Sequence, residues 1–331
     1  MSVVISMLVG SKLSTKALVL NSVMSIIENI GCTNYHLVVG VAPYVGQGIK
    51  RHLKDMIAER RIRDRRLARR QGKLKSRTKT KDCITIIDKN CHTFAAFTNY
   101  VFSKYASKAK WFIVAHDDVQ LKTPNFIPTV ENAVSGLKEN VGWISFTDDD
   151  YLNRHWAPST RPGYHYDLLY ENAWGNKQVF QFHSLTKGWL AAKKPHFEKV
   201  DFPIAPVKCH TPFSHFIMIE TEKLRKIGLC EDWCEVSLLI DEDWGLSALK
   251  EGMFNIWIPN IVYTHCRTLG TRAGPIIAKR GKEVHAKFYK KWGFHSDPEG
   301  EAELEFIRKN YGDTNIVWSF GKRTFEWDYI K

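Results

Sequence analysis

Apolar residues in the first half of the chain form short continuous runs, separated by segments with helical spacing. A run that is apolar on both faces is typical of a strand buried in a parallel sheet. We predict five such strands, at residues 3–9, 37–41, 84–88, 111–114 and 142–146. Between them, apolar residues recur every three or four positions and predict helices at about 15–30, 94–101 and 125–137.

The alternation resumes near residue 216, after a stretch without clear periodicity. We predict a strand at 216–219, a helix ending at Gly228, a helix at 242–251 capped by Gly252, and two strands at 254–258 and 261–264. Residues 151–212 are rich in Pro, His, Tyr and Trp, and we interpret them as irregular structure around an acceptor site.

Strands and helices that alternate in this order predict an α/β fold, with a mostly parallel sheet and helices on both faces. Ligands of such sheets bind at the carboxyl ends of the strands. The first half therefore has the features of a nucleotide-binding unit. It contains neither a G-x-G-x-x-G turn after its first strand nor a P-loop, which argues against dehydrogenases and P-loop kinases.

Composition favours a globular protein, because 44% of the 331 residues are hydrophobic and 25% are charged. The N-terminal apolar run is too short for a signal peptide, and no run approaches the roughly 20 apolar residues that span a bilayer. We therefore expect a cytoplasmic protein without a transmembrane segment. The seven cysteines are irregularly spaced and are expected to be reduced thiols.

The net charge of +13 is concentrated in one segment. Residues 50–81 hold fifteen Lys and Arg against three acids, so the rest of the chain is nearly neutral. A run this dense repels itself and favours a partner with the opposite charge. Two partners fit, a nucleic-acid backbone or an anionic membrane surface.

Three groups of polar residues follow predicted strands or open a predicted helix. His116-Asp117-Asp118 ends a buried strand, where carboxylates can hold Mg²⁺ or Mn²⁺ beside substrate phosphates. His265 follows the strand at 261–264 and could complete a metal site with Asp118. Asp241-Glu242-Asp243 opens a helix and offers a general base, although acids at a helix start are also stabilised by its dipole alone. A further acidic run, at 148–150, could bind metal but fits a solvated loop better.

These motifs, in this order, resemble the inverting family 2 glycosyltransferases of the GT-A fold. The resemblance covers roughly residues 3–293. Ala115-His116-Asp117-Asp118-Val119 is similar to the family's L-D-D-D-V metal motif. Its other parts are the stretch from Asp88 to Asn99, the block from Phe216 to Gly228 with Ile240-Asp241-Glu242-Asp243, the segment Gly252 to His265, and Phe288 with Lys291-Trp292-Gly293.

The resemblance implies a role for each matching residue. Asp118 and His265 would bind the metal, and Asp117, His116 and Asn90 would contact the donor. Asp243 would be the catalytic base, with Glu242 beside it. The cofactors implied are Mn²⁺ or Mg²⁺ and a nucleotide-sugar donor, in the first place a UDP-sugar. Residues 1–150 would be the nucleotide-sugar-binding, Rossmann-like half, and residues 151–331 the acceptor-binding and catalytic-base half of the same domain.

Two departures from the family pattern concern the donor. His116 replaces the first Asp of the metal triplet. The chain reads Gly40-Val41-Ala42-Pro43-Tyr44 where the family has D-D-G-S after its second strand, with an Asp toward the nucleotide base. Base recognition must therefore rest on other residues.

The basic segment at 50–81 interrupts the family pattern and bears on the acceptor. Between residues 58 and 81 it has few large apolar residues and no aromatic residue, which favours phosphates over lipids. The acceptor hypothesis is a hydroxylated base in DNA, with contacts from Arg65, Arg66, Arg69 and Arg70. Two alternatives are a transferase acting on lipid-linked or cell-surface polysaccharide and a non-catalytic nucleic-acid-binding protein on the same fold.

Overall fold

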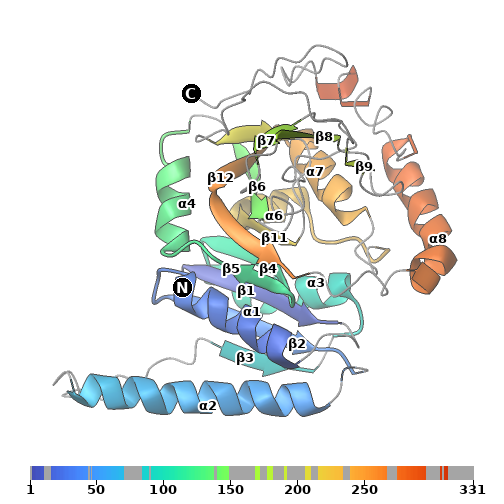
Figure 1. Ribbon diagram of the computed structural model, residues 1–331. Helices are drawn as coiled ribbons and strands as arrows, with labels where there is room; N and C mark the ends of the chain where they lie inside the picture. Colours follow the sequence, from blue (N-terminus) through green and yellow to red (C-terminus); the bar gives the residue numbers. More distant parts are fainter. Residues whose placement is uncertain are drawn as a thin grey trace.

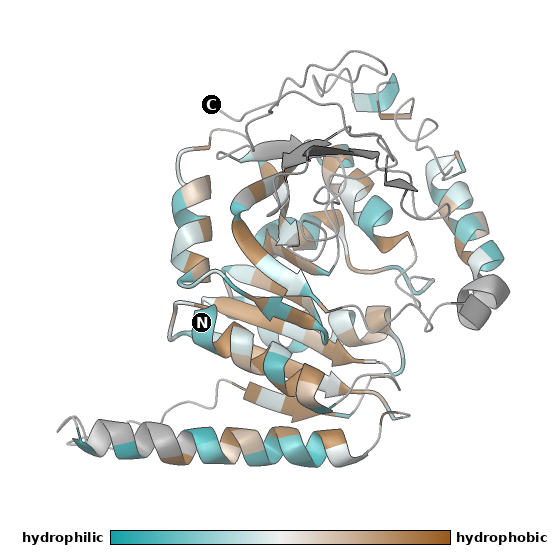
Figure 2. Ribbon diagram, in the orientation of Figure 1, coloured by the Kyte–Doolittle hydropathy of each residue, from teal (hydrophilic) through white to brown (hydrophobic). Residues whose placement is uncertain are grey.

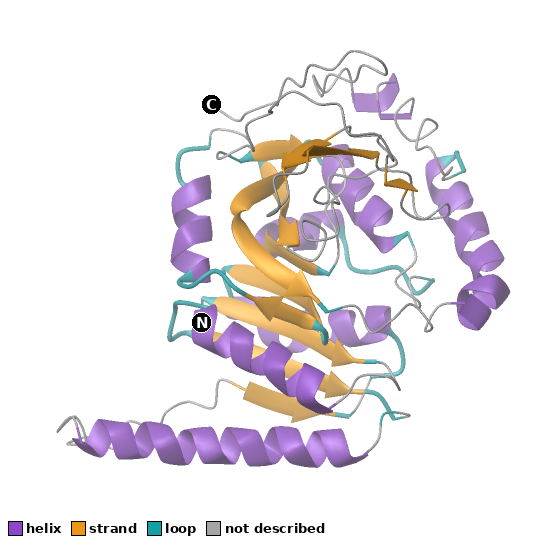
Figure 3. Ribbon diagram, viewed as in Figure 1, coloured by secondary structure: helices purple, strands orange, loops and turns teal. Residues whose placement is uncertain are grey.

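The protein is described from a computed structural model, coloured by secondary structure in Figure 3. The described residues are 2–10, 16–43, 45, 47–70, 84–88, 91–137, 140–148, 168–171, 177–181, 190–191, 206–209, 215–233, 239–266, 274–295, 306–307 and 309–311. None of the described helices is both long enough and apolar enough to cross a bilayer.

A mixed sheet of nine strands forms the centre of the described part of the molecule (Figure 1). Its order is β10-β12-β6-β11-β4-β1-β2-β3, and β5 pairs with β12. The strands are β1 (Val3–Val9), β2 (Tyr35–Val41), β3 (Ile84–Ile87), β4 (Trp111–His116), β5 (Val119–Leu121), β6 (Val141–Asp148), β10 (Val207–Cys209), β11 (Phe216–Glu220) and β12 (Phe254–His265). Strands β4, β1, β2 and β3 run parallel, as do β6 and β12. Strand β11 lies antiparallel between β4 and β6, so the sheet combines strands from both halves of the chain.

Helices cover both faces of this sheet, as the sequence predicts. Because successive side chains of a strand point to opposite faces, the alternating residues of β1 and β2 enter two separate cores. One core contains α1 (Lys16–Asn29), the first half of α2 (Gln47–Arg70) and α4 (Phe126–Val134). The other contains α3 (Phe94–Tyr105) with the short 3-10 helix η1 (Ala106–Lys108), α6 (Thr221–Ile227) and α7 (Ile240–Lys250).

Helix α8 (Gly274–Trp292) forms an additional layer outside α7. Leu246 and Leu249 of α7 pack against Val284 and Phe288 of α8. Every residue of α7 from Ile240 to Leu249 is buried, because the helix lies between the sheet on one side and α8 on the other. The acidic start of α7 is thus enclosed by protein.

Gly40 shows how closely the helices approach the sheet. A Cβ atom built at this position of β2 would lie 2.3 Å from the ring of Phe97 in α3. Only glycine accepts that approach, so the packing of α3 explains why the chain has Gly40 near the end of β2.

Two sequence predictions about the second half of the chain are wrong. The strands expected at 254–258 and 261–264 are one strand, β12, whose register against β6 shifts between Ile258 and Val262. Pro259 lies within that shift, as expected for a residue that cannot donate to a ladder. The irregular structure expected at 151–212 contains a three-stranded antiparallel sheet, β7 (Leu168–Glu171), β8 (Lys177–Gln181) and β9 (Leu190–Ala191). Most of the rest of that segment lies outside the described residues.

Among the described side chains of helix α2, the buried apolar ones lie in its first half. Leu53 is fully buried and Ile57 nearly so, whereas Ile62, on the following turns, is 50% exposed. Lys50 forms an ion pair with Asp88, directly after β3, and fastens the start of the helix to the sheet edge. Hydrophilic residues dominate the helix in Figure 2.

Candidate active site

The chain reverses direction at the end of β4, and this turn carries the predicted metal motif. His116 is the last residue of β4, Asp117 and Asp118 form the turn, and β5 begins at Val119. Strand β5 then pairs with the end of β12, where His265 lies opposite Val119. The backbone N–H of Cys266 donates to the carbonyl of Asp118 at 2.8 Å. Pairing of β5 with β12 therefore brings the two predicted metal ligands to one place.

The side chains of Asp118 and His265 are in direct contact. His265 Nε2 lies 3.1 Å from Asp118 Oδ1, and both side chains are buried. Their separation is far below the ~10 Å that would prevent a shared metal ion from reaching both. Asp117 is also buried, at 1% exposure. Its predicted role toward the donor remains a prediction.

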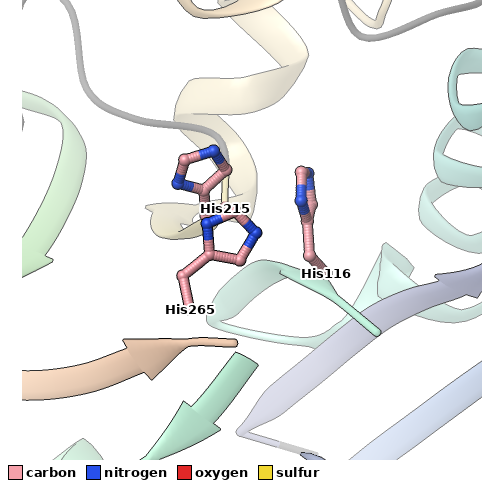
Figure 4. A group of neighbouring side chains, drawn as sticks. All are labelled: His116, His215 and His265. Atoms are coloured by element: carbon pink, nitrogen blue, oxygen red, sulfur yellow. The ribbon is translucent and has the colours of Figure 1, made fainter. Parts of the chain in front are cut away.

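Two further imidazoles surround this pair (Figure 4). His116, His215 and His265 each offer a ring nitrogen, and these nitrogens lie within 4.8 Å of one another. The ring of His215 is stacked on that of His265, with centroids 3.9 Å apart. The ring of His116 lies edge-on to both, at 5.1 Å from His215 and 5.7 Å from His265.

His215 is not among the residues predicted from the sequence. The residue precedes β11, and its carbonyl accepts a hydrogen bond of 2.8 Å from the N–H of His116. Because β11 runs antiparallel to β4, with Phe216 opposite Ala115, His215 lies opposite His116. Only the antiparallel pairing of β11 with β4 reveals this neighbour, and that pairing cannot be deduced from a histidine between a poorly periodic segment and an apolar run.

The donor atoms at this site fit a divalent metal ion. Asp118 offers a carboxylate oxygen and the three histidines offer imidazole nitrogens, both of which are ordinary ligands of Mn²⁺ and related cations. The residues come from three different strand ends and the turn, so their backbones are fixed by the sheet ladder. A rigid backbone holds such ligands in place.

A second acidic group lies at the start of α7. Asp241, Glu242 and Asp243 are all buried, at 8%, 2% and 1% exposure. Leu239, just before the helix, has the left-handed backbone angle φ of 58°, which is unusual for a residue with a branched side chain. This strained turn leads into the acidic first turn of the helix, and strain of this kind persists where the surrounding structure enforces it.

Asp243 is held by two residues of α8. Lys291 Nζ lies 2.8 Å from Asp243 Oδ1, and Trp292 Nε1 donates to the same oxygen at 2.9 Å. Lys291 also contacts Glu231 at 3.0 Å. Burial raises the pKa of Asp243 above its usual value of 3.8, while Lys291 and Trp292 oppose that shift. The Lys-Trp pair of the predicted tail motif therefore acts on the predicted base.

Aromatic contacts connect the start of α7 to the histidines. Trp244, next to Asp243, lies 6.4 Å from Phe94, whose ring lies 5.8 Å from that of His116. On its other side Trp244 stacks on Trp143 of β6, with centroids 4.5 Å apart. A continuous series of aromatic contacts thus connects the acidic start of α7 with the histidine cluster.

Two asparagines belong to the motif between Asp88 and Asn99, and one of them, Asn90, is a predicted donor contact. Asn90 lies outside the described residues. Asn99, from the same motif, makes two hydrogen bonds with the backbone of Cys230, donating at 2.8 Å and accepting at 3.0 Å. Asn99 therefore fixes the segment that follows α6.

The four predicted phosphate-binding arginines lie in the projecting half of α2. Arg66 and Arg70 are exposed, and the side chains of Arg65 and Arg69 lie outside the described ones. Helix α2 follows the carboxyl end of β2 and is about 36 Å long at 1.5 Å per residue. Its last turns lie toward the amino ends of β2 and β3 (Figure 1), whereas His116 and His265 are at the carboxyl ends of β4 and β12.

Comparison with known proteins identifies the fold. No family model matches the sequence, and no curated protein matches it. A crystal structure of GalNAc-T7 with UDP, GalNAc and Mn²⁺ is similar at a TM-score of 0.54 and 11% sequence identity, over 95% of this chain and 52% of that one. A crystal structure of S. aureus TarS 1-349 matches at a TM-score of 0.46 and 7% identity, over 94% of this chain and 72% of that one. The chain spans about half the length of the GalNAc-T7 chain, and it has the GT-A-like fold that its sequence predicts.

Proposed function

We propose that this protein is a metal-dependent glycosyltransferase that moves a sugar from a nucleotide-sugar donor to an acceptor hydroxyl, with inversion at the anomeric carbon. The observation that carries the proposal is the contact of Asp118 with His265 at the carboxyl edge of a GT-A-like sheet. A UDP-sugar is the first donor to test, because the similar GalNAc-T7 structure contains UDP and Mn²⁺.

In this proposal Asp118 and His265 would hold the metal ion, as expected from the sequence. His116, expected from the sequence as a donor contact, would join them because its ring nitrogen lies near that of His265. A bound divalent cation neutralises the diphosphate leaving group, which is the electrostatic help that sugar transfer requires. Asp117, at the tip of the same turn, is the donor contact predicted from the sequence. Asn90 follows β3, whose carboxyl end lies at the same edge of the sheet as that of β4, and it keeps its predicted role beside the donor.

Asp243 is proposed as the base that takes the acceptor proton, with Glu242 as its neighbour. A buried carboxylate whose pKa is raised accepts a proton more readily than an exposed one. Trp292 donates to Oδ1 of this carboxylate, and Lys291 lies 2.8 Å from Oδ1 and 3.1 Å from Oδ2, so together they fix its orientation. Glu242 also lies near α8. Burial lowers the pKa of His285, a residue of α8, and the negative charge of Glu242 opposes that shift.

The activity test uses a panel of nucleotide sugars with Mn²⁺ or Mg²⁺ and duplex DNA that carries hydroxymethylated bases. Nucleoside mass spectrometry reads out the product, and release of the nucleoside diphosphate reports donor cleavage. Transfer from one donor, abolished by chelation of the metal, is expected. Absence of donor cleavage with every nucleotide sugar and every acceptor class would overturn the proposal.

The acceptor we propose is a hydroxylated base in DNA. The support is the second half of α2, in which Arg66 and Arg70 are exposed and the sequence places Arg65 and Arg69 beside them. Because this part of the helix runs toward the amino ends of the strands, away from the predicted metal ligands, the arginines suit a long polyanion rather than the reaction site. The helix is about 36 Å long and a duplex rises 3.4 Å per base pair, so about ten base pairs match its length.

The acceptor classes can be separated with a fourfold variant, Arg65→Ala with Arg66→Ala, Arg69→Ala and Arg70→Ala. If the arginines contact phosphates, loss of four contacts flattens the dependence of log affinity on log salt by about 3.6 and raises the apparent acceptor constant. The loss should be similar across DNA sequences. Donor hydrolysis without acceptor should be unchanged, because the metal ligands are intact.

The same variant also tests the two alternatives. Unchanged duplex binding together with lost binding to anionic vesicles would replace the DNA acceptor with lipid-linked or cell-surface polysaccharide. DNA binding without any donor cleavage by the parent protein would indicate a non-catalytic nucleic-acid-binding protein on this fold.

A further inference from the structure

His215 adds a third imidazole to a site for which the sequence supplies two. Its neighbours His116 and His265 correspond to positions that the sequence motifs already single out, whereas His215 belongs to none of those motifs. The hydrogen bond from the His116 N–H to the His215 carbonyl keeps the two residues opposite each other. The ring of His215 is stacked on that of His265.

The spacing of the ring nitrogens suits a shared ion. Two imidazole nitrogens bound at about 2.1 Å to one metal lie at most about 4.2 Å apart. The nitrogens of His116, His215 and His265 lie within 4.8 Å of one another, so small side-chain rotations bring all three to one ion. Figure 4 shows the three rings gathered at one point between the strand ends.

The composition of this ligand set differs from that of a magnesium site. Mg²⁺ prefers oxygen ligands in a near-octahedral arrangement and keeps several waters. Imidazole suits Zn²⁺, Co²⁺ and other transition metals, whose affinity for nitrogen rises along the first row. Three clustered imidazole nitrogens, with the carboxylate of Asp118 3.1 Å from His265 alone, therefore favour a transition metal.

We propose that His215 is a metal ligand which, together with His116, His265 and Asp118, makes the site selective for a transition metal over Mg²⁺. The inference rests on the metal site of the proposed function but needs neither donor nor acceptor. Its test is therefore made by metal binding alone. Failure of sugar transfer leaves it standing, and failure of His215 to bind metal leaves sugar transfer standing.

The direct measurement is X-ray absorption of the full-length protein, without a histidine tag, loaded with Co²⁺ or Zn²⁺. Imidazole rings give a characteristic outer-shell pattern that can be counted. Three imidazoles are expected, and two would overturn the proposal. This measurement uses the unmodified chain, so it does not depend on whether a variant folds.

The variant His215→Gln gives the second measurement. We expect its affinity for Co²⁺ and Zn²⁺ to fall by at least ~10-fold to 100-fold, the range seen when even an outer partner of a metal site is lost. Its affinity for Mg²⁺ should change by less than about threefold, so the preference of the site for Co²⁺ and Zn²⁺ over Mg²⁺ becomes smaller. Calorimetry measures the dissociation constant of each metal, and the visible absorption of bound Co²⁺ gives a second measurement for that ion.

The matched control is His295→Gln, because His295 is exposed and stacks on Tyr289 at the end of α8. It should bind every metal like the parent. A His215→Gln protein that folds and binds Co²⁺ like the control would overturn the role of His215. A parent protein that binds no divalent metal would overturn both this inference and the metal part of the proposed function.

Discussion

The two buried acidic groups of this protein are neutralised in different ways. Asp118 lies 3.1 Å from a histidine, which carries charge only when it is protonated, and two more histidines lie nearby. Asp243 lies 2.8 Å from a lysine and receives a further hydrogen bond from Trp292. Both aspartates are almost completely buried, so in each case a partner must compensate the charge.

The difference indicates which group depends on a ligand. A cluster of imidazoles beside a carboxylate is a set of electron-pair donors that a cation can complete. A carboxylate paired with lysine already has its cation in the protein. In our proposal the turn after β4 therefore receives an ion, while the start of α7 holds a carboxylate in a fixed orientation without one. Substitution of either group can test this distinction.

The largest effect is expected for Asp243→Asn. Loss of a general base lowers turnover by about 10²–10⁴-fold. Affinity for the metal ion should stay within about twofold, because Asp243 is held by α8 and not by the metal ligands. Steady-state transfer and calorimetry measure the two quantities, with Glu251→Gln at the exposed end of α7 as the control. Near-normal turnover would exclude Asp243 as the base, and a product that keeps the donor's anomeric configuration would exclude a single displacement.

Asp118→Asn should give the opposite pattern. Metal affinity is expected to fall by about 100-fold or more, since an inner ligand is lost. A metal present at 100 times its dissociation constant stabilises the folded parent by about 2.7 kcal/mol, and the variant should lose most of that gain. Thermal unfolding with and without metal measures it, and Asp232→Asn, at an exposed position, is the control. If metal stabilises the variant as much as it stabilises the parent, Asp118 is not a metal ligand.

Lys291→Met removes the positive partner of Asp243 and should change the pH profile of the reaction. Burial raises the pKa of Asp243 and Lys291 opposes that rise, so the variant's pKa should be higher still. Activity should then be lost at a higher pH than in the parent as the solution is acidified. The variant is also expected to be less stable, because the buried Asp243 loses the positive charge beside it, although Lys291 itself is partly exposed.

The control for this change is Lys290→Met, since Lys290 is exposed beside it. If both variants lose activity at the same acidic pH as the parent, Lys291 does not influence the pKa of Asp243. Metal affinity should be unchanged in both.

The smallest effect concerns alkaline pH. Burial alone would lower the pKa of Lys291, but Asp243 and Glu231 raise it above its usual value of 10.5. A raised lysine pKa stabilises the folded state fully below about pH 10.5, and that stabilisation is lost as the pH rises through the higher folded value. The difference in melting temperature between the parent and Lys291→Met should therefore shrink above that pH. A constant difference between pH 8 and 11 would contradict the pairing.

The sequence predicted the sheet of the first half because its strands are buried on both faces. Continuous apolar runs such as Val3–Val9 have few other interpretations, and the helices between them showed clear spacing. Prediction failed where pairing determines structure. The bend in β12 looked like a break, and the short strands β7 to β9 have too few residues for a periodic signal.

The candidate site was partly predictable for the same reason. Asp118 and His265 follow buried strands and could be found by position, whereas His215 becomes visible only once β11 is known to run antiparallel to β4. Lys291 and Trp292 were noticed as a motif, but only the packing of α8 on α7 shows that they contact Asp243. The roles of these residues remain predictions.

The position of β11 between β4 and β6 has a consequence for how the chain is synthesised. Strand β4 leaves the ribosome about 100 residues before β11, which supplies its second neighbour. At 5–20 residues per second this interval lasts on the order of 5–20 s. During it, β4 presents an apolar edge with unpaired backbone groups, and β6 has neither of its neighbours. Chaperones that bind exposed strands should therefore associate with nascent chains from which β4 has emerged but β11 has not, and release them once β11 has emerged and paired.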